Sequence, residues 1–287
     1  MGCLQPLRIV EPSVDYPELE LYWREGYAVV RGLFSAEEVA EIALAADQVH
    51  AEGVEHGRSF RHGNLFYNVV PGDDPLVRMV QWPSYHQPVL NRVRLDRRIA
   101  RLLEPIIGRN LKQIINQIHW KVPGSLGDFA WHQDSRSRRP ASAYRNLAAS
   151  YVQTGLAIDP HTPESGGMRF IPRSHVGGDL GMDCSRKALG TAMTGATLDA
   201  VGLSESEAVD LILEPGDLAL WSPYLVHGSG TNRSEHQRRF YINGYVRAPD
   251  CDRGEWAFRD GRPVPFGPQP ELVHYEELRE RPGPHYV

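Results

Sequence analysis

The feature that most constrains the fold is a change of hydrophobic period near Leu111. Before it, apolar residues recur at helical spacing in segments that begin at Ser35 and Asp96. After it, apolar and polar side chains alternate in short segments, separated by turns rich in glycine and proline. A helical front followed by many short strands predicts a mainly β fold with flanking helices, namely a double-stranded β-helix, or cupin-like jelly roll.

The ends of these elements are marked in the sequence. Ser35 and Glu38 form a capping box, and the helix that Asp96 begins stops at Gly108. A turn at 214–217 between two apolar runs predicts a hairpin, and Asp260-Gly261 predicts a last one. A short helix is expected at 15–24, and the expected strands are 26–32, 66–70, 111–121, 150–158, 168–171, 209–213, 218–221 and 238–246.

Composition limits the class of protein. A chain of 287 residues that is 41% hydrophobic can bury one large core, so 1–287 is expected to be a single domain. The net charge of -5 gives no reason to expect a nucleic acid or membrane partner. Cys3, Cys184 and Cys251 are too far apart for a disulfide framework and predict reduced thiols in a cytoplasmic protein. The expected partner is a small-molecule substrate, with the chain a monomer or homodimer.

One motif predicts a metal centre. His132 and Asp134 form a His-x-Asp pair on an extended segment, where alternation puts both side chains on one face. A third ligand has to come from elsewhere, and His227 is the best candidate. Two histidines and one carboxylate form the facial triad of non-haem Fe(II) oxygenases, which leaves metal positions open for other ligands.

Several motifs together resemble the phytanoyl-CoA dioxygenase family of Fe(II)- and 2-oxoglutarate-dependent oxygenases. The resemblance spans roughly residues 20–247. The motifs that carry it are GYAVVRGL at 26–33, WHQD at 131–134, ESGGMRFIPRSH at 164–175, PGD at 215–217 and HGSGTNRS at 227–234. It implies Fe(II), 2-oxoglutarate and O2 as cofactor and cosubstrates.

The resemblance also implies roles for single residues. The metal ligands of the family fall on His132, Asp134 and His227. The arginine that binds the distal carboxylate of 2-oxoglutarate falls on Arg238. Arg239 is the alternative, because alternation along a strand lets only one of the two face the interior.

Further cosubstrate contacts are expected on neighbouring strands. Ser229 resembles a second contact to the distal carboxylate, and Gln117, His119 and Lys121 resemble polar contacts on the strand before the motif. The family has asparagine where this chain has His119, so that contact differs here. Thr154 resembles a further position that lines the cosubstrate pocket.

Three arginines follow the metal motif closely. Arg136, Arg138 and Arg139 are expected at the mouth of the barrel, where one of them would hold a carboxylate or phosphate of the substrate. The glycine-rich segment 177–204 is expected to form a lid over the same opening. His175 is expected to have a structural role in its loop.

These features predict a dioxygenase that hydroxylates a small, polar or acidic molecule and releases succinate and CO2. The same cofactors also support desaturation, cyclisation or epoxidation, which the sequence does not distinguish. Halogenation is disfavoured, because halogenases of this fold lack the carboxylate ligand that Asp134 provides here. A non-catalytic ligand-binding jelly roll is the alternative from another class, and the complete set of ligands argues against it.

Overall fold

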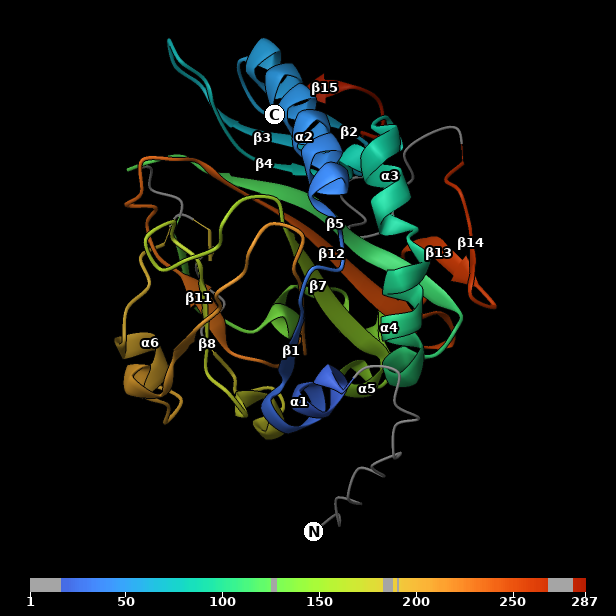
Figure 1. Ribbon diagram of the computed structural model, residues 1–287, viewed down its shortest axis with the longest axis vertical. Coiled ribbons are helices and arrows are strands. Elements are labelled where there is room, and N and C mark those ends of the chain that lie inside the picture. Colours follow the sequence, from blue (N-terminus) through green and yellow to red (C-terminus); the bar gives the residue numbers. More distant parts are fainter. Residues whose placement is uncertain (1–16, 125–127, 183–187, 190, 268–280) are drawn as a thin grey trace.

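Two antiparallel sheets face each other in the computed structural model, which describes residues 17–124, 128–182, 188, 189, 191–267 and 281–287 (Figure 1). The predicted jelly roll is confirmed. The larger sheet has the order β1-β10-β7-β12-β5-β4-β3-β2-β15, extended by β13 and β14, and the smaller one has the order β6-β11-β8-β9.

The larger sheet is organised around two long central strands. These are β5 (Leu111–Lys121) and β12 (Arg238–Arg247), which pair in the register Arg238 to Lys121 and Ile242 to Gln117. The other strands are β1 (Tyr27–Val30), β2 (Phe60–His62), β3 (Leu65–Val70), β4 (Leu76–Gln81), β7 (Tyr151–Ala157), β10 (Leu218–Trp221), β13 (Glu255–Arg259), β14 (Arg262–Pro263) and β15 (His285–Tyr286).

Helices cover the outer face of this sheet (Figure 1). The principal ones are α2 (Ala36–His56), α3 (Pro88–Arg94) and α4 (Arg97–Ile107), and their apolar faces form one core with the sheet. The predicted capping box is present at the start of α2. Shorter helices are α1 (Glu18–Glu25), α5 (Leu147–Ser150) and α6 (Ala196–Asp199). Among the described residues, no helix is long and apolar enough to cross a bilayer.

The smaller sheet carries the metal motif. Its strands are β6 (Phe129–His132), β8 (Met168–Phe170), β9 (Val209–Asp210) and β11 (His227–Ser229). β11 pairs with β6 so that His227 lies opposite His132. Aromatic and aliphatic side chains from both sheets fill part of the space between them.

The predicted hairpin between 209–213 and 218–221 is wrong. β9 pairs with β8 in the smaller sheet, whereas β10 lies between β1 and β7 in the larger one. The turn before β10 therefore carries the chain from one sheet to the other. Asp217 fixes this corner, because its carboxylate accepts hydrogen bonds from the backbone N–H of Gly32 at 2.7 Å and of Glu214 at 2.9 Å. The predicted hairpin of β13 and β14 is confirmed.

The segment 177–204 is not placed as a lid where the structure describes it. Met182 and Leu198 pack against Trp131 and Val226, on the face of the smaller sheet that points away from His132 and His227. Residues 183–187 and 190 lie outside the described part, as do the N-terminal arm, Cys3 and Cys184. Cys251 is a buried free thiol.

Candidate active site

Three side chains converge on one point between the sheets. His132 at the end of β6, Asp134 just beyond it and His227 at the start of β11 each offer a ligand atom, and these atoms all lie within 4.8 Å of one another. The His227 Nε2 to Asp134 Oδ2 distance is 3.8 Å, too long for a hydrogen bond. A cluster of donor atoms that do not bond to one another fits a metal ion.

The histidines are oriented for coordination by their backbone contacts. The Nδ1 of His132 lies 2.8 Å from the carbonyl of Ala130, and the Nδ1 of His227 lies 2.9 Å from that of Leu225. A carbonyl only accepts, so each Nδ1 carries the proton and each Nε2 keeps a free lone pair. Burial, with the neighbouring His227, lowers the pKa of His132 to about 3, so its imidazole is neutral and able to bind a metal.

Asp134 is held by an indole. The Nε1 of Trp221 donates a hydrogen bond to Asp134 Oδ2 at 2.9 Å. Burial alone would raise the pKa of this carboxyl, but His227, Arg138, His132 and the Trp221 bond together lower it, so it stays ionised. Sequence reasoning did not find Trp221, and no motif marks it.

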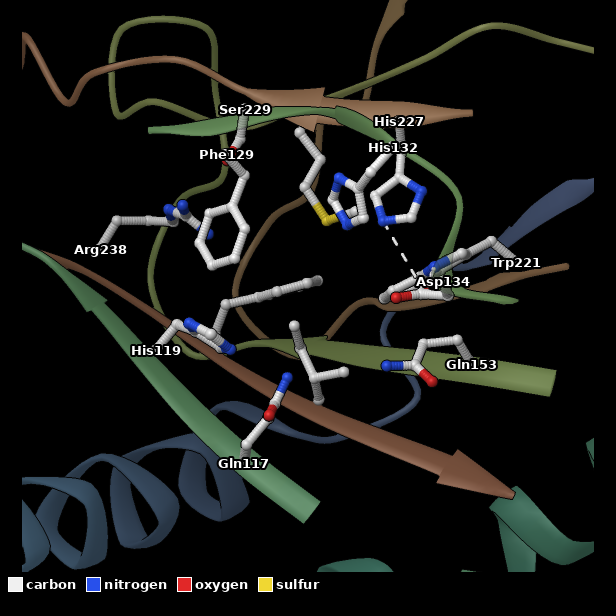
Figure 2. Close-up of a pocket in the computed structure, with 13 residues that line it drawn as sticks. Gln117, His119, Phe129, His132, Asp134, Gln153, Trp221, His227, Ser229 and Arg238 are labelled. Carbon is white, nitrogen blue, oxygen red and sulfur yellow. Dashed lines mark hydrogen bonds and ion pairs between the residues drawn. The ribbon is translucent and has the colours of Figure 1, made fainter. Parts of the chain in front are cut away.

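The ligand atoms open onto a cavity between the two sheets (Figure 2). About 510 Å³ within and at the mouth of this cavity is not filled by protein atoms, and part of that space is open to solvent. Its lining combines the three possible ligands with polar and apolar side chains. The lining residues are Gln117, His119, Phe129, His132, Asp134, Gln153, Met168, Trp221, His227, Ser229, Arg238, Phe240 and Ile242.

Arg238 is a buried cation at the opposite end of this cavity from Gln153 (Figure 2). Its Nη2 donates to the carbonyl of Gly166 at 3.0 Å, and its Nη1 lies 3.4 Å from His161 Nδ1. Among the described residues, its Nε has no hydrogen-bond partner and no carboxylate forms an ion pair with it. Burial lowers its pKa to about 10, so the guanidinium remains charged at neutral pH. A buried charge of this kind favours a bound anion.

Arg239 lies on the other side of the strand. It pairs with Asp159 at 2.7 Å and with Asp47 at 2.8 Å, so its charge is already neutralised. The cavity therefore receives Arg238, the one that the sequence favoured. His161, which was not singled out from the sequence, contacts Arg238 and is fully buried.

The other expected cosubstrate residues surround the same end. Ser229, Gln117 and His119 line the cavity, and burial lowers the pKa of His119 to about 3. Lys121 lies just outside the lining, where its Nζ donates to Ser229 Oγ at 2.8 Å and to the carbonyl of Gly230 at 2.6 Å. Burial lowers the pKa of Lys121.

Thr154 does not line the cavity, so that prediction is wrong. Its hydroxyl donates to the carbonyl of Asn243 on β12, on the face of β7 that is turned toward the helices. Its neighbour Gln153 points into the cavity instead. The error is one residue, and in a strand one residue reverses the face.

The three arginines after the metal motif do not act as a group. Arg138 is buried, with Nη2 donating to the Tyr151 hydroxyl at 2.7 Å, whereas Arg139 is exposed and Arg136 half-buried. His175 Nε2 lies 3.3 Å from the carbonyl of Trp23, away from the metal cluster, in keeping with a structural role.

Two proteins that are similar to this chain are named as dioxygenases. The chain is 25% identical over 253 residues to "Dioxygenase lolE1" of Epichloe uncinata, covering 87% of this chain and 88% of that protein. It is 27% identical over 235 residues to "Probable alpha-ketoglutarate-dependent hypophosphite dioxygenase" of Stutzerimonas stutzeri, covering 79% and 77%.

The fold is similar to that of EctD from S. alaskensis, solved with 2-oxoglutarate and 5-hydroxyectoine, with a TM-score of 0.67 and 21% identity over 96% of this chain and 92% of that one. The family profile described as "Phytanoyl-CoA dioxygenase (PhyH)" matches residues 22–240. The chain thus belongs to the phytanoyl-CoA dioxygenase family, whose enzymes use Fe(II), 2-oxoglutarate and O2.

Proposed function

We propose that this dioxygenase hydroxylates a small polar or acidic molecule, with Fe(II) bound by His132, Asp134 and His227. The observation that carries the proposal is the composition of one cavity. Three neutral or anionic donor atoms face its interior at one side, and the guanidinium of Arg238, which forms no ion pair with any described carboxylate, faces it at another. A metal ion fits the first feature, and a free carboxylate fits the second.

The polar side chains of the cavity have different roles. Arg238 and Ser229 bind the distal carboxylate of 2-oxoglutarate, and His119 and Gln117 are placed to contact the same molecule. Lys121 holds Ser229 in position. When bound, iron, 2-oxoglutarate and O2 supply the oxidising power that converts a C–H bond into C–OH, with release of succinate and CO2.

Apolar side chains keep water from the reacting atoms. Phe129, Met168, Phe240 and Ile242 surround the polar groups in the lining, which limits side reactions of the oxidant. The name of the relative that acts on hypophosphite, and the ligand in the EctD structure, support a small polar substrate. Desaturation, cyclisation and epoxidation use the same chain residues and differ in substrate placement.

The test is the binding of 2-oxoglutarate to the Fe(II) protein without oxygen, followed by the visible charge-transfer band of the complex. Arg238→Ala is expected to weaken binding by about 2–4 kcal/mol, or roughly 30- to 1000-fold, because it removes a buried charged partner. Arg239→Ala is the matched control, since Arg239 already pairs with Asp159 and Asp47.

Two results would overturn the proposal. One is a wild-type protein that forms no band with Fe(II) and 2-oxoglutarate. The other is an unchanged binding constant in Arg238→Ala. A screen of candidate substrates for succinate release above the uncoupled background then tests hydroxylation itself.

A further inference from the structure

Gln153 lies on the metal side of the cavity, away from Arg238 (Figure 2). On β7 it is the direct cross-strand partner of Trp221 on β10, the residue whose indole holds Asp134. The side-chain amide of Gln153 is therefore close to the candidate metal centre. It lies on the opposite side of the cavity from the Arg238 guanidinium, which is assigned to 2-oxoglutarate.

Two buried polar side chains contact the side-chain oxygen of Gln153. The hydroxyl of Tyr151 donates to Gln153 Oε1, and Arg138 Nη2 also approaches that oxygen, at 3.5 Å. Arg138 bonds Tyr151 in turn, at 2.7 Å. Gly244 leaves room for this group, because a Cβ there would lie only 2.0 Å from the Tyr151 hydroxyl.

This network fixes which way the amide points. Two donors approach Oε1, so a flipped amide would set its own NH2 against the guanidinium and the hydroxyl. The amide nitrogen is thus the atom turned toward the cavity (Figure 2). Gln153 presents a donor, and Arg138 behind it strengthens that donor by polarising the amide.

The charge of the Arg138 guanidinium is not matched by an ion pair with any described residue. Arg138 is 5% exposed, and among the described residues its Nε has no hydrogen-bond partner and no ion pair includes it. Asp134 contributes to its electrostatic environment, but that carboxylate is turned toward the metal cluster. A cation buried beside the cavity without a salt bridge favours a negatively charged partner nearby.

We propose that Gln153, positioned by Arg138 and Tyr151, is the residue that binds an anionic oxygen of the substrate, such as a carboxylate oxygen. The proposal rests on the function proposed above and adds the substrate class to it. The apolar side chains of Trp221, Ile242 and Phe240 would then contact the carbon skeleton. The substrate would be an organic acid whose acidic group lies on the side of the cavity that holds the metal-ligand side chains, away from Arg238.

The test compares three probes with one ring and different charges: cyclohexanecarboxylate, cyclohexanecarboxamide and cyclohexylamine. Each is added at neutral pH, without oxygen, to the Fe(II) and 2-oxoglutarate complex. Binding is followed by calorimetry and by the shift of the visible band. The wild-type protein is expected to bind the carboxylate at least about tenfold more tightly than the amine, the effect of about one charge-assisted hydrogen bond.

Variants assign the preference to single residues. Gln153→Glu replaces the donor by a carboxylate that pairs with Arg138, and is expected to abolish the preference for the carboxylate probe. Gln153→Leu and Arg138→Gln are expected to reduce the carboxylate preference. Arg139→Gln, which removes the exposed arginine next to Arg138, is the control and should keep the wild-type order. Circular dichroism checks that each variant folds. If Arg138→Gln fails to fold, Gln153→Leu still tests the proposal.

Failure of this inference differs from failure of the proposed function. If the wild-type complex forms its band but binds no probe, binds all three alike or prefers the amine, the inference is overturned. The same holds if Gln153→Glu keeps the carboxylate preference. A protein that forms no band with 2-oxoglutarate overturns the function on which the inference rests.

Discussion

At the scale of single residues, one indole nitrogen connects the protein core to the candidate metal centre. Trp221 is 1% exposed and donates to Asp134 Oδ2, so it fixes the carboxylate from behind. Trp221→Phe keeps a buried aromatic ring there but removes the hydrogen bond. We expect the affinity for Fe(II) to fall about 10- to 100-fold, as when other groups that orient metal ligands are lost.

Trp120→Phe provides the control for this change. Trp120 is also buried, but its Nε1 has no hydrogen-bond partner in the described part of the chain, and it does not line the cavity. Anaerobic Fe(II) titrations of both variants measure the difference. Equal affinities in the two variants would mean that the indole of Trp221 does not orient the ligand.

Site residues that stand in sequence motifs were predicted. Site residues that reach the cavity only through the packing of the strands were missed. His132, Asp134 and His227 stand in motifs, and the structure brings them together. Gln153 follows no motif, and its place depends on which face of β7 meets the cavity. The alternation from Arg238 to Phe240 and Ile242 was a usable signal, since all three share one face and line the cavity.

At the scale of elements, the strands were predictable and their partners less so. Local alternation locates β5, β7 and β12, but it does not say which sheet a strand joins. The segments flanking the turn before β10 have the pattern of a hairpin, yet they belong to different sheets. The short strands β2 and β15, at one end of the larger sheet, have too few residues for a period to appear.

The corner at Asp217 shows what replaces hairpin pairing there. This carboxylate is 3% exposed, accepts from the backbone of Gly32 and Glu214, and pairs with Arg31 at 2.6 Å. Asp217→Ala leaves those N–H groups without their acceptor. We expect the free energy of unfolding to fall by about 2–4 kcal/mol, measured by urea denaturation.

The control for this substitution is Asp73→Ala. Asp73 is exposed in the turn between β3 and β4, so its loss should change the free energy of unfolding by less than about 0.5 kcal/mol. A urea midpoint for Asp217→Ala close to that of Asp73→Ala would show that the corner is held by packing instead.

At the scale of the whole molecule, the space between the sheets buries several ionisable groups. His119, His161, Arg238 and Lys121 are all nearly inaccessible, on strands and loops that meet at one end of the cavity. Cations this close together raise the free energy of the folded state. They also disfavour protonation of the histidines between them, and the pKa values of His119 and His161 are both lowered, by burial first and then by Arg238.

The consequence is a stability that falls in acid. The pKa of His119 is about 3 in the folded chain and 6.5 ordinarily, so below pH 6.5 the unfolded chain takes up a proton that the folded chain does not. The free energy of unfolding of the metal-free protein should therefore decrease as pH falls from 6.5 toward 3. The slope approaches about 1.4 kcal/mol per pH unit for each such histidine.

His119→Gln removes the contribution of one histidine to the pH dependence of the free energy of unfolding, because glutamine does not titrate. Glutamine is also close to histidine in size. Between pH 5.5 and pH 4, urea unfolding of the metal-free variant should depend on pH less steeply than wild type, by about 1.4 kcal/mol per pH unit. His236→Gln removes an exposed histidine and should leave the wild-type slope unchanged. Parallel slopes for wild type and His119→Gln would mean that His119 takes up its proton in the folded state. Water or an anion would then have to reach this end of the cavity, because a protonated His119 adds a third positive charge beside Arg238 and Lys121.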